Sequence, residues 1–178
     1  MIAVIRRLTT DYVYPEDRLR LSAELASAPP VTMWLTQRLA LRLLPKLLRW
    51  LDRQIGATVA PGDEAPRSTT PELQTQVVHA FAQEVALAEL KQDSPVQAAA
   101  SDGWLIQSVE LALAENRIGL AFRAADGRAA GVGVTVQELR QWLAVIHGLW
   151  LLAEWPPALW PSWMQGEAAP SGRQIVLH

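Results

Sequence analysis

Cysteine is absent from this 178-residue chain, which excludes disulfide bonds, thiolate metal ligands and cysteine nucleophiles. Long hydrophobic runs are absent too, because no uncharged stretch reaches the roughly 18 apolar residues that span a bilayer. The nearest candidate, residues 143–160, contains a histidine and a glutamate and is broken by two prolines. The N-terminal apolar run covers only residues 2–5 and precedes the arginines, unlike a secretory signal peptide. We therefore expect a soluble, cytoplasmic protein without a membrane span.

Motifs of catalysis and cofactor binding are missing as well. The chain contains no HExxH, GxSxG, GxGxxG or P-loop pattern. Gly131 and Gly133 are separated by one residue, but they precede a strand end and not a helix that could bind a phosphate. The histidines, His79, His147 and His178, are scattered, and no further ligands cluster beside them. We expect a protein that is not an enzyme and that holds no cofactor and no metal.

Charge is distributed unevenly along the chain, although the formal net charge is only −2 and the pI is about 5.9. Residues 1–56 contain nine Lys or Arg and five Asp or Glu, a net of +4, whereas residues 57–178 contain seven and thirteen, a net of −6. These regions could attract each other within one chain or between copies. A nucleic-acid-binding domain usually has a pI above about 9, so we expect no nucleic-acid partner.

An internal similarity relates residues 16–36 to residues 115–135. Both segments begin with Glu, a carboxylate or amide, and Arg, then alternate apolar and polar residues, and end in Thr. The alternation predicts half-buried antiparallel strands near 2–14, 17–25 and 31–36, and matching strands in the second half. Helices should follow at about 37–55 and 137–154, with Thr36 and Thr135 as N-caps. The predicted fold is therefore α+β, with two βββα repeats whose helices pack on the sheet, and an additional helix between them.

The expected organisation follows from this pattern. Gly, Pro, Ser and Thr are concentrated between the two halves, as in a linker. One compact domain overall is expected from the chain length. Its parts are a first βββα unit at 1–56, a linker plus helix at 57–100, a second βββα unit at 101–155, and a Trp/Pro-rich segment and tail at 156–178.

The middle helix, at about 70–90, has a clear start in the sequence Thr-Pro-Glu, which offers an N-cap, a proline at the first position and an early acid. Its apolar residues recur at spacings of three and four and form one face. These residues are Leu73, Val77, Ala80, Phe81, Val85 and Ala88. In the first helix, by contrast, Pro45 should kink or divide the helix, because proline lacks the N–H that the turn needs.

Basic residues recur along the first helix at spacings of four, four, three and four residues, so they share one face. Such a face could bind phosphates or an acidic partner. The simpler alternative is a solvated face that pairs with Glu72, Glu84 or Glu89 of the middle helix. The basic face consists of Arg38, Arg42, Lys46, Arg49 and Arg53.

Tryptophan is concentrated late in the chain, with four of the eight between residues 147 and 164. Trp150 aligns with Trp50 in the repeat and should pack in the core. From residue 155 onward, prolines prevent a continuous helix and stiffen the backbone. Three roles stay open for this segment: a lid over the core, an interface with another chain, or a stacking platform for sugars or bases. The candidate interaction residues are Trp155, Trp160, Trp163 and Met164.

Two functional hypotheses follow. The first is a non-enzymatic protein–protein interaction or scaffold/assembly protein that acts through the Trp/Pro-rich C-terminal surface, with a protein partner or a second copy in a homodimer. The alternative is a small-molecule or carbohydrate-binding domain with its site between the two halves.

Overall fold

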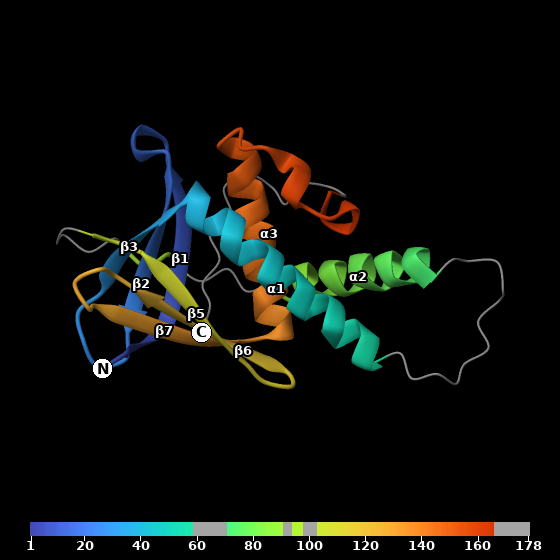
Figure 1. Ribbon diagram of the computed structural model, residues 1–178, viewed down its shortest axis with the longest axis horizontal. Helices are drawn as coiled ribbons and strands as arrows, with labels where there is room; N and C mark the ends of the chain where they lie inside the picture. The colour runs from blue at the N-terminus through green and yellow to red at the C-terminus, as the bar shows by residue number, and fades with distance from the viewer. Residues whose placement is uncertain (59–70, 91–93, 98–102, 166–178) are drawn as a thin grey trace.

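The computed structural model describes residues 1–58, 71–90, 94–97 and 103–165. In these residues the chain forms a curled seven-stranded sheet with three α-helices, so the α+β class is confirmed (Figure 1). The first part contains β1 (Ala3–Val13), the 3-10 turn η1 (Tyr14–Glu16), β2 (Arg18–Leu25), β3 (Val31–Thr36), α1 (Gln37–Thr58) and α2 (Pro71–Ala88). The second part contains β4 (Trp104–Leu105), β5 (Ser108–Leu113), β6 (Arg117–Arg123), β7 (Ala129–Thr135), α3 (Val136–Leu152), η2 (Pro157–Leu159) and η3 (Ser162–Met164).

The strands are ordered β4-β3-β2-β1-β7-β6-β5 across the sheet. β1, β2 and β3 pair antiparallel, as do β5, β6 and β7. Two junctions are parallel, which the sequence did not predict: β1 pairs with β7 at Ala3 and Ala130, and β3 pairs with β4 at Met33 and Trp104. The expectation of antiparallel strands therefore holds within each group of three and not between the groups.

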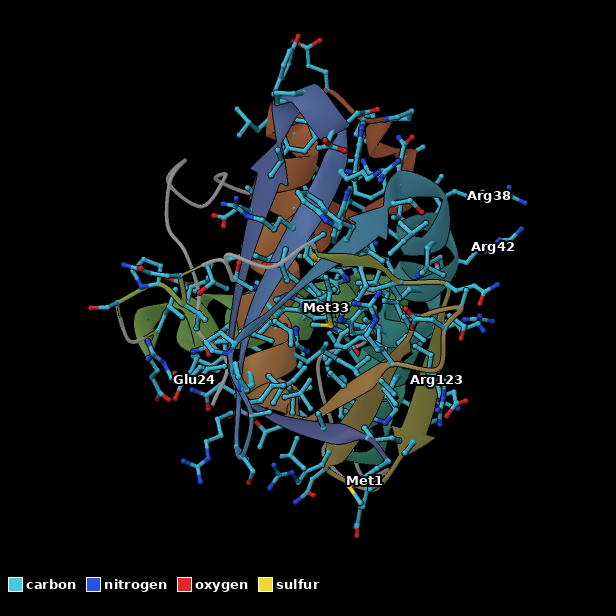
Figure 2. All side chains as sticks on the ribbon, turned by 90° about the vertical axis from the view of Figure 1, so that its left-hand side faces the viewer. Met1, Glu24, Met33, Arg38, Arg42 and Arg123 are labelled. Atoms are coloured by element: carbon cyan, nitrogen blue, oxygen red, sulfur yellow. The ribbon has the colours of Figure 1, made fainter. Side chains whose placement is uncertain are left out.

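The core forms on the sheet face that the alternating apolar residues share, where α1 and α3 cover it. On β2 the alternate residues Leu19 and Leu21 are buried, and on β6 Ile118 and Phe122 are buried. Figure 2 shows Met33 in the middle of the molecule, and its side chain is fully buried. The alternation thus placed one face of β2 and one face of β6 in the core, as half-buried strands require.

Both helices that follow a strand begin at the predicted threonine. The Thr36 Oγ1 accepts a hydrogen bond from the backbone N–H of Leu39 at 3.2 Å. Thr135 forms a capping box, in which its Oγ1 accepts from the Glu138 N–H and the Glu138 carboxylate accepts from the Thr135 N–H at 2.7 Å. α1 continues through Pro45 without division, because leucines on both sides of the proline are buried and tertiary packing supports the helix.

The middle helix α2 lies beside α3, η3 and α1 and extends away from the sheet (Figure 1). Its bounds, Pro71–Ala88, agree with the predicted helix at about 70–90. Because α2 does not lie on the sheet, its partners are helices and the late tryptophan segment, and its orientation decides which surface the protein presents there.

Candidate functional site

The apolar face of α2 points to solvent. Val77 and Phe81 are each 67% exposed, in the middle of this face. A periodic apolar face normally packs on a core, so this orientation is the reverse of the usual one. We define the α2 outward face by its large exposed apolar residues, which are Leu73, Val77, Val78, Phe81 and Val85.

The opposite side of α2 carries polar side chains, and these are buried. His79 is only 1% exposed, and Gln83 and Ala86 are buried on the same side. Gln83 donates from Nε2 to the backbone carbonyl of Arg140 at 3.0 Å, which joins α2 to α3. A second hydrogen bond from a side-chain amide joins the same helices in the other direction: Gln141 Nε2 donates to the Ala86 carbonyl at 2.8 Å. Directional hydrogen bonds therefore fix which side of α2 faces inward.

His79 contacts residues of three elements: Arg140 on α3, Asp52 on α1 and Trp163 in η3. Its Nδ1 lies 3.1 Å from Nη2 of Arg140 on α3. Since a guanidinium can only donate, Nδ1 accepts and the proton of the neutral ring is on Nε2. That Nε2 lies 3.0 Å from the carboxylate of Asp52 on α1, which places a negative charge beside the ring. Burial, followed by the charge of Arg140, lowers the pKa of His79, and Asp52 opposes this shift. The ring is therefore neutral at pH 7.

Arg140 and Trp163 complete this cluster. The Arg140 side chain is buried, with 2% of the residue exposed, and burial lowers its pKa to about 10, so its positive charge persists at neutral pH. The guanidinium lies 5.4 Å from the ring centre of Trp163. The same indole stacks on His79, with ring centres 4.6 Å apart and planes inclined by 11°. Trp163 thus covers both the guanidinium cation of Arg140 and the neutral imidazole of His79, and its distance from the guanidinium is one at which cation–π attraction is favourable.

The other residues of the tryptophan segment pack on the protein itself. α3 ends at Leu152, and Glu154, two residues later, has a left-handed φ of 55° and turns the chain back. Trp155, Trp160 and Met164 are buried, whereas Trp163 is half-buried. Of the three roles that the sequence left open, a lid over the core is the one that this packing describes within a single chain.

Trp150 organises the lid. It is fully buried and meets Trp155 and Trp160 edge to face, with ring centres 4.8 and 5.8 Å away. The Trp150 Nε1 donates to the Pro156 carbonyl at 2.9 Å. Trp155 in turn donates from Nε1 to Asp17 in the turn after β1, also at 2.9 Å. These contacts fasten residues 155–164 to α3 and to the turn between β1 and β2. The role of the four predicted interaction residues toward another chain stays a prediction.

The basic face of α1 is exposed along its whole length. All five of its residues are exposed, and Figure 2 shows Arg38 and Arg42 pointing away from the helix into solvent. In the part of the chain that the structure describes, no ion pair joins this face to the acids of α2. The predicted pairing with Glu72, Glu84 or Glu89 is therefore not formed there; Glu89 instead accepts from the Gln137 side chain at 2.6 Å.

The sequence predicted the apolar face of α2 but not the buried polar residues that hold the opposite side of the helix against α3. His79, Gln83 and Arg140 were not assigned to one cluster, since they come from two helices and periodicity does not pair elements. One signal was available, because His79 and Gln83 are four residues apart on the side opposite the apolar face. Polar residues at that spacing, on the side opposite an apolar face, are compatible with a second packed side.

Other site types find no support in the described ranges. No group of three or more histidine, aspartate or glutamate side chains there could hold a metal ion. None of the described helices is both long and apolar enough to cross a membrane. No protein-family model, curated protein or solved structure matches this chain.

Proposed function

We propose that this chain is a non-enzymatic interaction or assembly protein that docks another protein chain through the α2 outward face. The observation that carries the proposal is the orientation of α2, with His79 and Gln83 buried and Val77 and Phe81 exposed. Contiguous apolar patches of several hundred Å² on a soluble protein usually mark an interaction site. Burying the apolar side against the protein's own helices would have been the lower-energy choice, unless a partner covers it.

In this proposal the tryptophan segment acts as a clamp and not as the docking surface. Trp163 stacks on His79 and covers Arg140, which keeps the polar side of α2 inward. Burial of Trp155 and Trp160 leaves them little area for a partner. The Trp/Pro-rich segment thus contributes to interaction by orienting α2.

A protein partner fits the charge of α2 better than a lipid surface. Residues 71–88 contain no lysine or arginine and include Glu72 and Glu84. Helices that lie on membranes are typically rich in lysine and arginine on their polar side, for attraction to anionic lipids. We place this assembly role in the cytoplasm, as the sequence suggests.

We further propose that the two halves arose by duplication. The order β1-β2-β3-α1 resembles the order β5-β6-β7-α3, and Thr36 and Thr135 cap the two helices in similar ways. This proposal does not include the alternative function, small-molecule or carbohydrate binding at a site between the two halves.

The natural absence of cysteine makes a clean test possible. A single cysteine is introduced as Val77→Cys, or as Leu152→Cys in a matched control, since Leu152 is a comparably exposed residue, at 62%, on α3. Both variants are labelled with a membrane-permeant maleimide, in the producing cells and as dilute purified protein.

We expect the cysteine at 77 to react fast in the dilute protein and to be protected in cells, while the control reacts in both. Equal labelling in cells at both positions would refute the docking function. Slow labelling at 77 even at high dilution would refute it too, since the chain itself would then cover the face.

A further inference from the structure

We infer that the partner on the α2 outward face is a second copy of this chain, with the two α2 helices antiparallel about a two-fold axis. This inference rests on the proposed function and names the occupant of that site. It is argued from three properties of α2: the symmetry of its outward residues, the position of its single outward charge, and the area that is exposed.

The outward face is centred directly opposite His79. Successive residues of an α-helix are rotated by about 100°, which places the midpoint between Val77 and Phe81 on the side of the helix away from His79. His79 is the most buried residue of α2. A two-fold axis through this midpoint therefore passes through the most exposed part of the molecule's apolar face.

Residues that such an axis brings together match in chemistry. In an antiparallel pair centred on position 79, Val77 of one copy meets Phe81 of the other. Leu73 and Val85 lie on opposite edges of this stripe, about 60° either side of its midline, and add apolar area beside the central pair. A two-fold interface must be self-complementary, and the two central pairs of Val77 with Phe81 satisfy that condition.

The outward charge specifies the antiparallel direction. Gln74 and Glu84 are both exposed on this side of α2. In the antiparallel register Glu84 meets Gln74 of the second copy, whose amide can donate to the carboxylate. A parallel pair would instead place the two Glu84 carboxylates at the same level of the interface, and like charges that face each other across an interface weaken it.

The area is sufficient for a modest dimer. From the exposed fractions of its five large residues, the α2 outward face presents roughly 500 Å² of apolar surface, at the upper end of the largest patches found on monomers. If both faces were covered completely, they would bury at most about 1,000 Å², the lower limit for a specific interface. We therefore expect a dimer with a dissociation constant in the micromolar range.

The test measures the mass of the purified full chain by light scattering over a concentration series, and the dissociation constant by analytical ultracentrifugation. We expect the mass to rise from one to two chains. Phe81→Gln should weaken the dimer about a hundredfold, whereas the matched Leu152→Gln should leave it unchanged. Circular dichroism and the melting temperature of dilute protein check that each variant folds.

Two substitutions at Gln74 test the direction. In the antiparallel pair Gln74→Lys creates two new contacts with Glu84 and should tighten the dimer several-fold, while Gln74→Glu should weaken it several-fold. A parallel pair reverses the sign for lysine, because the two new lysines would then face each other. Weakening by Gln74→Lys therefore overturns the antiparallel arrangement.

The outcomes separate this inference from the function beneath it. A chain that stays monomeric at high micromolar concentration, but whose cysteine at 77 is protected in cells, overturns the second copy and leaves docking of a different protein. A monomer that binds vesicles of phosphatidylcholine and phosphatidylglycerol also overturns it. If Phe81→Gln unfolds the dilute chain, the face is internal, and both the inference and the proposed function fail.

Discussion

Replacing Trp160 by alanine tests whether the late tryptophan segment belongs to the core. Trp160 is 3% exposed and contacts His147 and Trp150, with ring centres 4.9 and 5.8 Å away. Truncating a buried tryptophan to alanine typically costs about 3–5 kcal/mol, against a total stability of about 5–15 kcal/mol. For a chain of this size each kcal/mol lowers the melting temperature by about 2–4 °C, so we expect a fall of about 10 °C.

The assay is thermal and urea unfolding followed by circular dichroism, at one fixed protein concentration because association would shift the midpoint. Trp163→Ala is the comparison, since Trp163 is only half-buried, and it should cost less than Trp160→Ala. An unchanged melting temperature for Trp160→Ala would refute the reasoning and would mean that the tryptophan segment is not packed in the core.

Phenylalanine substitutions refine the same prediction. The Trp150 N–H donates to Pro156 at 2.9 Å, whereas the buried Trp160 N–H has no partner among the described residues. Trp150→Phe removes the hydrogen bond to Pro156 as well as ring volume, so it should lower the free energy of unfolding by about 2 kcal/mol. Trp160→Phe loses similar volume but also removes an unsatisfied donor, so it should cost about 1 kcal/mol less than Trp150→Phe. Equal losses of stability would contradict the assigned hydrogen bonds.

Three further predictions concern single residues. Thr135→Ala removes half of the capping box of α3 and should lower stability by about 1 kcal/mol; an unaltered urea midpoint would contradict it. Glu154→Gly removes the steric strain of a non-glycine residue at a left-handed φ of 55° and should raise stability by about 0.5 kcal/mol. Differential scanning calorimetry can detect this change. A lower melting temperature would show that Glu154 is not strained. Burial lowers the pKa of His147, so the unfolded chain binds the proton more readily and stability falls as the pH drops through about 6.5. His147→Phe should flatten this acid-side slope of unfolding free energy, and an equally steep slope in the variant would show that other groups carry it.

The local elements were predictable because their causes are local. Alternation predicted strands near 2–14, 17–25 and 31–36, and the structure forms β1, β2 and β3 at Ala3–Val13, Arg18–Leu25 and Val31–Thr36. The hydroxyls of Thr36 and Thr135 marked the helix starts for the same reason. The parallel junctions were not predictable, since they join strands from distant parts of the chain and leave no periodic signal.

The candidate site was predictable only in part. The spacing of residues identified the apolar side of α2 but not whether that side faces the protein or solvent. Periodicity describes the helix itself and not the elements around it. The direction depends on Arg140, Trp163 and Asp52, which meet His79 only in the folded chain. For the tryptophan segment, prolines indicated stiffness, yet whether Trp160 faces inward depends on how sharply the chain turns at Glu154.

The junction of β1 with β7 has a consequence for how the chain reaches its fold. Ala3 and Val4 pair with Ala130 and Gly131, so β1 acquires one of its neighbours only after β7, more than 100 residues later, has been synthesised. Contacts between residues so distant in sequence slow folding, because the loop must close before they form. Until then this edge of β1 presents unpaired backbone groups that could pair with other chains. Conditions that slow synthesis of the second half should therefore increase aggregation of the nascent protein.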